Sequence, residues 1–270
     1  MKLVVRILLG AALAVAVFYA AVFGYVYLNQ RALQYNPVGS VVALAEAGLP
    51  GAEAVAIASG SGTINGWYQA PRADRPVILY FKGNSGSFST EHGRLEQFAA
   101  DGYGFLAFDY RGFPLSPGDI SQDNILQDAT SAFDWLQAKG FPIVIWGRSL
   151  GSGPATYIAS RRDAVALLFE VGFFSAVSVA NERYPFLPVG LAMQDTFRVD
   201  QWIVDVAEPM MVAHGTTDNV ISVSNGERVH ELAPNPDELW IEPDAGHDDL
   251  WARGLWPRAE AFFTRAMARR

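Results

Sequence analysis

Hydrophobic residues form two kinds of pattern along this 270-residue chain, and the first is one unbroken run near its start. From Ile7 to Leu28 there is no charged residue. At a helical rise of about 1.5 Å per residue, such a run can cross a hydrocarbon core of about 30 Å. Tyr19, Tyr25 and Tyr27 cluster toward its far end, where aromatic rings favour the membrane interface. The pattern predicts a transmembrane helix, and we assign residues 1–30 to a membrane anchor.

A cleaved signal peptide is the alternative interpretation, because Lys2 and Arg6 form a basic stretch ahead of the run. The run is longer than the roughly 7–15 residues of a signal sequence, and no A-x-A site with a polar start after it follows. We therefore favour an uncleaved anchor. Lys2 and Arg6 precede the span and Arg31 follows it, so the positive-inside rule favours a cytoplasmic N-terminus and an extracytoplasmic domain.

The second pattern is a series of short apolar runs between turn residues, typical of strands buried on both faces. The first two runs are joined by S-G-S-G and predict an antiparallel edge. The expected strands are Ala54–Ala58, Ile64–Tyr68, Val77–Phe81, Gly104–Phe108, Ile143–Trp146, Val165–Phe169, Met210–Ala213 and Glu238–Ile241.

Helical segments are expected between these strands, and their alternation predicts an α/β protein with a mostly parallel central sheet flanked by helices. No linker or repeat divides residues 31–270, so we expect one domain there. The expected helices include Val41–Ala47, Thr90–Ala100, Asn124–Lys139 and Val223–Leu232.

Composition narrows the possible functions. Half of the residues are hydrophobic and 18% are charged, as in a packed globular domain. A net charge of −8 gives no electrostatic support for binding nucleic acid. Cysteine is absent, which excludes disulfides and a thiol nucleophile, and the four histidines lack metal-ligand spacing. We therefore expect no metal and no cofactor.

The strongest chemical signal is G-R-S-L-G at residues 147–151, directly after an expected strand. A strand, a sharp turn around serine and a helix make a nucleophile elbow. The turn strains the backbone of Ser149, and side chains two positions away on either side would collide, so Gly147 and Gly151 are required there. Ser149 is therefore the expected nucleophile.

A serine nucleophile needs a histidine base and an acid that orients it, and in this kind of fold they follow in the order Ser, Asp or Glu, His. His247 lies in the loop after the last expected strand, and Asp218 lies beyond the end of the strand before it. We assign these two residues as base and acid. His214 and His230 are interpreted as structural. The remaining acidic candidates either precede the Asp218 strand or lie too close to His247 in sequence: Asp195, Asp200, Asp205, Asp244, Asp248 and Asp249. Asp248 or Asp249 is instead expected to cap a helix that begins near Leu250.

The loop K-G-N-S-G-S after Val77–Phe81 is expected to supply one oxyanion donor, and the backbone N–H of Leu150 the other. Gly83 and Gly86 would let this backbone approach a substrate closely. A simple strand-to-helix turn is the alternative.

Five motifs resemble the membrane-anchored bud-emergence branch of the α/β-hydrolase superfamily: F-K-G-N-S-G, F-D-Y-R-G-F-P-L-S, G-R-S-L-G, H-G-T-T-D and A-G-H-D-D-L. R-A-L-Q-Y-N-P and R-Y-P-F-L-P-V extend the similarity over essentially the whole chain. The resemblance implies the α/β-hydrolase fold, Ser149, Asp218 and His247 as catalytic triad, and Asn84 and Leu150 as oxyanion donors. Members include lysophospholipid lipases and protein depalmitoylases.

One position departs from the family pattern, which usually has H-G-N where this chain has Lys82, Gly83 and Asn84. Lys82 either shapes the loop or meets an anionic group of the substrate. Elsewhere, Asp109 and Arg111 are expected to brace the rim of the site, and Arg148 to make a structural contact. The aromatic, proline-rich segment 173–199 is expected to form a short cap over an apolar acyl pocket.

The sequence therefore predicts a membrane-anchored serine hydrolase that cleaves carboxylic esters or thioesters of a small-molecule or lipid substrate through an acyl-enzyme. Peptide and carbon–carbon bond hydrolysis remain open, because a triad does not select the leaving group. A non-catalytic membrane-anchored interaction protein on the same fold is the alternative from another class.

Overall fold

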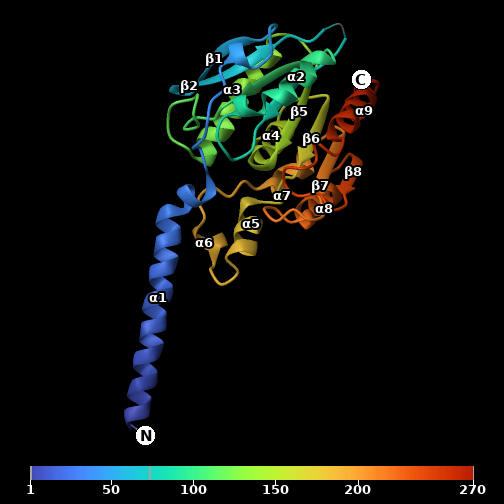
Figure 1. The fold of residues 1–270 in the computed structure, drawn as a ribbon. Coiled ribbons are helices and arrows are strands. Elements are labelled where there is room, and N and C mark those ends of the chain that lie inside the picture. The colour runs from blue at the N-terminus through green and yellow to red at the C-terminus, as the bar shows by residue number, and fades with distance from the viewer. Residues whose placement is uncertain (1, 73, 270) are drawn as a thin grey trace.

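An eight-stranded sheet forms the centre of the protein in the computed structural model, which describes residues 2–72 and 74–269 (Figure 1). The strand order is β1-β2-β4-β3-β5-β6-β7-β8. Each strand predicted from an apolar run is present. Their bounds are β1 Glu53–Ser59, β2 Gly62–Gln69, β3 Val77–Phe81, β4 Gly104–Phe108, β5 Ile143–Arg148, β6 Ala166–Glu170, β7 Met210–Gly215 and β8 Pro236–Glu242.

The sheet is antiparallel at one edge and parallel over the rest. β1 pairs with β2 and β2 with β4 in antiparallel register, and the other neighbours pair in parallel. In the parallel part Phe81 lies opposite Gly147, and Arg148 opposite Glu170. The carboxyl ends of β3, β5, β6 and β7 therefore lie together at the same end of the strands. Ligands bind at this end in open α/β sheets.

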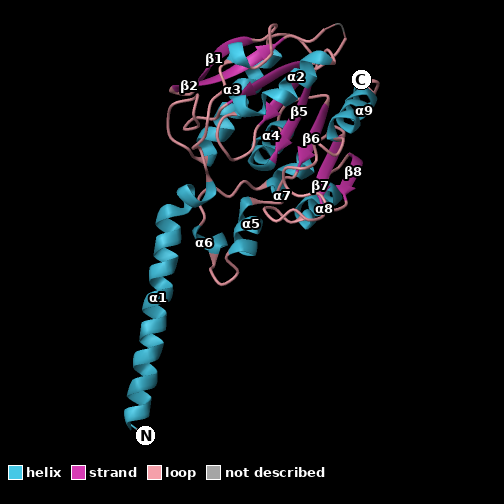
Figure 2. Ribbon diagram, in the orientation of Figure 1, coloured by secondary structure: helices cyan, strands magenta, loops and turns pink. Residues whose placement is uncertain are grey.

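Helices cover both faces of the sheet (Figure 2). The hydrophobic core on one face includes residues of α3, α4, α7 and α8, and the core on the other face includes residues of α2 and α9. The bounds are α2 His92–Ala100, α3 Gln122–Gln137, α4 Ser152–Ala159, α5 Ala176–Arg183, α6 Val189–Ala192, α7 Val199–Trp202, α8 Val223–Leu232 and α9 Leu255–Met267.

Strand β3 shows why the sheet has two cores. Its five residues are all fully buried, and alternate side chains point to opposite faces of a strand. Val77, Leu79 and Phe81 belong to one core, and Ile78 and Tyr80 belong to the other. A strand buried on both sides reads as a continuous apolar run, as the sequence does here.

Helix α3 follows from its local sequence. The Ser121 hydroxyl caps its N-terminus by accepting a hydrogen bond from the Asn124 N–H. Ile125, Ala129 and Phe133 follow at a spacing of four residues, and all three are fully buried. This spacing places them on one face of the helix, which packs against the sheet.

Two helical predictions are wrong in detail. Val41–Ala47 was expected to be a helix, but only Leu44–Glu46 forms a single 3₁₀ turn. The last helix was expected to begin near Leu250 with Asp248 or Asp249 as its cap, but α9 begins at Leu255 after Gly254. The two aspartates have other partners, because Asp248 contacts Arg148 and Asp249 accepts the Gly246 N–H at 2.7 Å.

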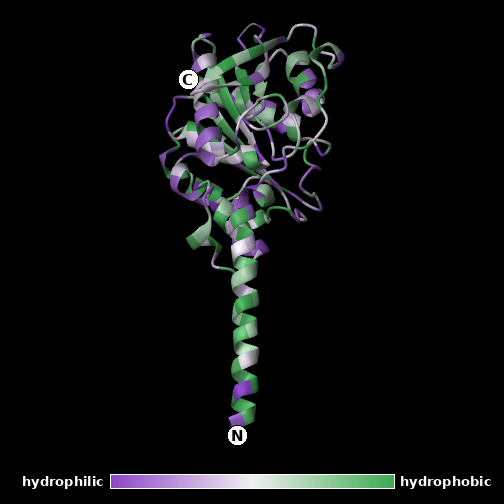
Figure 3. Ribbon diagram, turned by 90° about the vertical axis from the view of Figure 1, so that its left-hand side faces the viewer, coloured by the Kyte–Doolittle hydropathy of each residue, from purple (hydrophilic) through white to green (hydrophobic). Residues whose placement is uncertain are grey.

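Helix α1, Lys2–Gln34, projects from the domain (Figure 1). With 33 residues it is about 50 Å long, and it is long and apolar enough to cross a bilayer. Its projecting part is mainly hydrophobic (Figure 3), and none of its described side chains is buried in the protein. Its C-terminal half, from Tyr19 onward, contacts the domain on the side of α5 and α6 (Figure 1).

A buried aspartate joins α1 to the domain. The carboxylate of Asp195 accepts hydrogen bonds from Arg31 Nε at 3.0 Å and from the Tyr35 hydroxyl at 2.9 Å. The Gln34 amide donates to the Asp195 carbonyl at 3.0 Å. Asp195 is almost fully buried, so its charge depends on these donors for solvation.

Replacing Asp195 with alanine is expected to lower the free energy of unfolding by about 1–3 kcal/mol, because the buried Tyr35 hydroxyl and the Arg31 guanidinium lose their acceptor. Denaturant titration of the full chain in mild detergent measures the change. Asp200→Ala is the matched control, since it removes a partly exposed pair with Arg198 and is expected to cost less than about 1 kcal/mol. Equal effects of the two substitutions would contradict the role given to Asp195.

Candidate active site

Ser149 lies at the turn between β5 and the helical segment that leads into α4. A single 3₁₀ turn, Ser149–Gly151, connects the two elements, and Ser149 has a positive φ of 51°. Such a backbone conformation is strained for a residue with a side chain. The turn is crowded, because a Cβ at Gly151 would lie 2.0 Å from the Phe81 carbonyl oxygen, and one at Gly147 2.5 Å from Ala155 Cβ. The structure therefore has the elbow geometry expected from the sequence.

His247 and Asp218 come from the loops after β8 and β7, and the structure brings both to Ser149. His247 Nε2 is 2.9 Å from Ser149 Oγ, and its Nδ1 is 2.7 Å from Asp218 Oδ2. Both distances are those of hydrogen bonds. The three side chains thus form a continuous chain in the order predicted from the sequence.

The carboxylate of Asp218 is held by several donors. Its Oδ1 accepts the N–H groups of Val220 and Ile221, each at 2.9 Å. Burial raises the pKa of Asp218, but hydrogen bonds from His214, His247 and Ile221 outweigh it and hold the pKa well below its usual range. Asp218 therefore stays ionised and fixes the orientation of the His247 ring.

His214 is a second contact of Asp218 that the sequence analysis missed. Its ring is fully buried, and Nε2 lies 2.9 Å from the Ile221 carbonyl oxygen and 3.3 Å from Asp218 Oδ2. The ring thus supports the turn that carries Asp218, as expected, and also contacts the acid directly. The spacing of four residues in H-G-T-T-D was the available signal for this contact.

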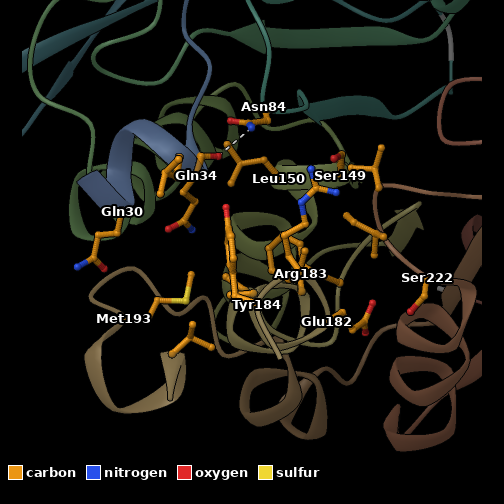
Figure 4. A pocket seen from close by; sticks show the side chains of 18 of the residues that line it. Gln30, Gln34, Asn84, Ser149, Leu150, Glu182, Arg183, Tyr184, Met193 and Ser222 are labelled. Atoms are coloured by element: carbon orange, nitrogen blue, oxygen red, sulfur yellow. Dashed lines mark hydrogen bonds between the residues drawn. The ribbon is translucent and has the colours of Figure 1, made fainter. Parts of the chain in front are cut away.

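One of the two expected oxyanion donors lies in the nucleophile turn and the other in the loop after β3. Leu150 follows Ser149 directly, and the loop after β3 passes close to Ser149, because a Cβ at Gly83 would lie 3.6 Å from Ser149 Cβ. The Asn84 amide is already engaged: Nδ2 donates to the Gln34 carbonyl at 2.8 Å, and Oδ1 accepts the Asn36 N–H at 3.2 Å (Figure 4). An oxyanion would therefore meet the backbone of this loop and not the Asn84 side chain.

Lys82 lies beneath this loop and is fully buried. Its Nζ donates to the carbonyls of Gly83 at 2.9 Å and Ser85 at 3.4 Å, and lies 3.9 Å from the centre of the Phe113 ring. Burial lowers the pKa of Lys82 to about 8, against the nearby charge of Asp109, which favours the ammonium. Lys82 does not line the cavity, so the interpretation in which it meets an anionic substrate group is wrong. It shapes the loop.

Arg148 connects the nucleophile turn to the loop that carries His247, because it pairs with Asp248. Behind it lies Glu170, which accepts two hydrogen bonds from Arg94 and one from Trp146, each at 2.8 Å. Burial raises the pKa of Glu170, but the Arg94 guanidinium outweighs this effect and keeps the pKa below its usual value. The sequence analysis missed Glu170, whose only signal was an acidic residue at the end of an apolar strand.

The two charged residues of the D-Y-R-G motif have separate partners. Asp109 accepts the N–H groups of Phe88 and Leu115 at 2.9 and 3.1 Å. Arg111 forms an ion pair with Asp128 at 2.7 Å, and both side chains are buried.

A cavity of about 1000 Å³ opens at Ser149 (Figure 4). Its walls come from the catalytic loops, from α1 and from the segment 173–199, so residues far apart in sequence share it. Such a volume accommodates a drug-sized or larger ligand. In residues 2–72 and 74–269, no group of three or more acidic or histidine side chains is placed to hold a metal ion.

Comparison with known proteins supports the fold. A Pyrococcus furiosus esterase has a similar structure, with a TM-score of 0.71 and 21% sequence identity, over 86% of this chain and 99% of that one. The esterase Est1E of Butyrivibrio proteoclasticus aligns with a TM-score of 0.64 and 16% identity, over 80% of this chain and 99% of that one. The eight-stranded sheet and its flanking helices are those of the α/β-hydrolase fold.

Sequence relatives agree with this fold. An uncharacterized protein of Mycobacterium tuberculosis is 29% identical over 242 residues, which are 87% of this chain and 86% of that protein. An alpha/beta hydrolase domain-containing protein of Caenorhabditis elegans is 33% identical over 185 residues, 64% of this chain and 53% of that protein. No protein-family model matches the chain. Membership in the bud-emergence branch stays a prediction.

Lys82 is expected to make folding stability depend on pH. Its pKa is about 8 in the folded protein against 10.5 for an ordinary lysine, so between these values the unfolded chain binds the proton that the folded chain releases. Stability therefore rises with pH in this window, and below about pH 8 the full cost of the buried ammonium is present. Lys82→Met removes this contribution.

We expect the difference in unfolding free energy between Lys82→Met and the native protein to change by up to about 1.4 kcal/mol per pH unit above pH 8. Denaturant titrations at several pH values up to about 9.5, before tyrosines ionise, measure it. Lys139→Met is the control, because Lys139 is exposed. A difference that stays constant with pH would show that the ammonium is not desolvated.

Proposed function

We propose that this chain, which has the α/β-hydrolase fold, is a membrane-anchored serine hydrolase that cleaves carboxylic esters or thioesters. One observation carries the proposal: the chain of hydrogen bonds from Ser149 through His247 to Asp218, at 2.9 and 2.7 Å. A serine hydroxyl is a weak nucleophile until a base in hydrogen-bond contact removes its proton.

The roles follow from the directions of these hydrogen bonds. With its ring proton on Nδ1 and donated to ionised Asp218, His247 presents Nε2 as an acceptor to the Ser149 hydroxyl. Nε2 takes that proton while Oγ attacks the acyl carbonyl carbon. It then gives the proton to the departing alkoxide or thiolate, which leaves an ester on Ser149. Water, activated by the same nitrogen, hydrolyses this acyl-enzyme and regenerates the hydroxyl.

The negative charge on the tetrahedral intermediate needs donors already in place. The backbone N–H groups of Leu150 and Asn84 are proposed for this role. Leu150 lies in the first turn of a helical segment, where the N–H groups are free of intrahelical partners. Asn84 lies in the loop that Lys82 supports from below, and this support fixes the loop before substrate binds.

Two features favour an ester or thioester of an apolar acyl group. The cavity beside Ser149 has apolar side chains in its walls, among them Phe173, Leu187 and Met193. The segment 173–199, which carries them between β6 and β7, is proposed as the short cap. The complete Ser149–His247–Asp218 chain argues against a non-catalytic interaction protein, for which its retention has no physical reason.

The anchor and its orientation are also part of the proposal. Helix α1 begins with Lys2 and Arg6, and its next basic residue is Arg31 beside the domain. This distribution favours a cytoplasmic N-terminus and an extracytoplasmic catalytic domain.

The first test of the function is chemical labelling. Ser149 is expected to react with a fluorophosphonate probe, because the phosphoryl oxygen would lie where the oxyanion donors point. Ser149→Ala should abolish labelling and the hydrolysis of short acyl esters. His247→Ala should remove most activity, and Asp218→Asn should lower kcat by about 10⁴-fold by favouring the wrong tautomer, as in the chymotrypsin-type triad.

Matched controls are Ser160→Ala at the end of α4 and His230→Ala in α8, which lie outside the cavity. Both should keep full labelling and turnover. Undiminished labelling of the Ser149→Ala protein would refute the nucleophile and the proposed function with it.

The second test concerns the anchor. The full chain should stay in the membrane pellet after carbonate washing, because the apolar run of α1 requires a bilayer. A chain beginning at Arg31 keeps the contacts to Asp195 and should appear in the supernatant. A reporter fused to the C-terminus should behave as exported. A mature N-terminus beyond Leu28, found by mass spectrometry, would show instead that the run is a cleaved signal.

A further inference from the structure

One face of α1 lines the cavity beside Ser149. The α1 residues at its wall are Phe23, Val26, Tyr27, Gln30, Leu33 and Gln34. These residues recur every three or four positions, and two pairs, Val26–Tyr27 and Leu33–Gln34, are adjacent in sequence. This spacing places all six on one face of the helix. The anchor therefore contributes a wall to the site from Gln34, beside the oxyanion loop, to Phe23, about 15 Å further along the helix.

The opposite wall comes from the α5–α6 segment, defined here as residues 176–194. Its cavity-lining side chains are mostly apolar and include Val179, Leu187, Val189 and Met193. The segment is tied to α1 at two levels: the Tyr19 hydroxyl donates to the Phe186 carbonyl at 2.9 Å, and the Gln194 N–H donates to Gln30 Oε1 at 2.7 Å. The space between α1 and this segment is thus a slot with many apolar side chains on its two connected walls, although Glu182 and Arg183 also line it.

The far end of this slot lies at the depth of the membrane surface. A span that starts after Arg6 reaches about 30 Å by residue 26, which is within the lining stripe. The α5–α6 segment descends along α1 in the same direction (Figure 1), and its Phe186 and Leu191 are 62% and 91% exposed. Exposed large apolar side chains at this depth would meet lipid and not water.

We propose that α1 is the acyl-chain wall of the active site: the acyl group of a membrane-resident amphiphile lies along the Phe23–Leu33 stripe, facing the α5–α6 segment, with its carbonyl at Ser149. This inference rests on the proposed function and names the substrate class of the same site. The amphiphile passes from the bilayer into the slot along α1 without its chain crossing water. The anchor therefore selects the acyl chain as well as holding the enzyme at the membrane.

The physical consequence concerns chain length. An acyl chain that moves from lipid to an apolar slot gains little hydrophobic free energy, because lipid tails are as apolar as the slot. Discrimination between chains must then come from the fit of the chain to the slot, and a side chain that fills it partway should exclude long chains only. Val26 lies between Leu33, near the oxyanion loop, and Phe23, so it is suited to this test.

The test uses the full chain in detergent micelles with 4-nitrophenyl acetate and 4-nitrophenyl palmitate. Val26→Trp is expected to lower kcat/KM for the palmitate ester at least about tenfold and to leave the acetate ester within about twofold. Leu28→Trp is the matched control: Leu28 is on the same helix, is 80% exposed and lies outside the cavity, so both esters should be unaffected.

A second variant covers the case in which Val26→Trp fails to fold. Phe23→Ala opens the far end of the slot and is expected to shift preference toward chains longer than palmitate. Fluorophosphonate labelling of each variant reports whether the serine is still active. An unchanged chain-length profile in labelled Val26→Trp and Phe23→Ala, or equal losses in Val26→Trp and Leu28→Trp, would overturn the acyl-chain wall. A native protein that neither labels nor cleaves the acetate ester would instead refute the proposed function.

Discussion

The site depends on the close approach of the nucleophile turn to the end of β3. A Cβ at Gly151 would overlap the Phe81 carbonyl oxygen, so the turn after Ser149 is packed directly on the backbone that leads into the Lys82–Gly86 loop. This contact allows the strained φ of Ser149 to persist, because the packed surroundings leave the backbone no relaxed alternative. It also sets the distance between the nucleophile and its oxyanion loop. His247 and Asp218 only complete an arrangement that two neighbouring parallel strands have already fixed.

Charged side chains near the nucleophile also hold the loops of the site in position. The Lys82 ammonium donates a hydrogen bond to a carbonyl of its own loop, and the Arg148 guanidinium pairs with Asp248 in the loop that carries His247. Each is buried at a cost in desolvation, visible in the lowered pKa of Lys82. Such costs are tolerated where a precise backbone position matters more than stability. The two cations thus hold loops; Lys82 lies outside the substrate cavity, and Arg148 is at its wall but pairs with Asp248.

The sheet and the Ser149, His247 and Asp218 positions could be predicted because each has a local signal. Buried strands appear as apolar runs, a glycine-flanked serine after such a run marks an elbow, and chain order separates Asp218 from its rivals. The missed features depend on contacts between distant residues. Nothing near Asp195 in sequence indicates Arg31 and Tyr35 as its partners, and Lys82 could not be assigned to either role until its burial was known. Asp248 and Asp249 were wrongly predicted to cap a helix. Asp248 pairs with Arg148, which is distant in sequence, and Asp249 accepts the Gly246 N–H.

The end of α1, the proposed membrane anchor, is joined to the proposed oxyanion loop by hydrogen bonds that involve backbone groups. Asn84 accepts the N–H of Asn36 and donates to the carbonyl of Gln34, and the Gly86 N–H donates to the Asn36 carbonyl at 3.1 Å. These three bonds fasten the proposed oxyanion loop to Gln34, the last residue of α1, and to Asn36. The loop is therefore braced on one side by Lys82 and on another by the end of α1. An anchor joined by a flexible linker could not provide this second support, which is a physical reason for α1 to continue without interruption into the domain.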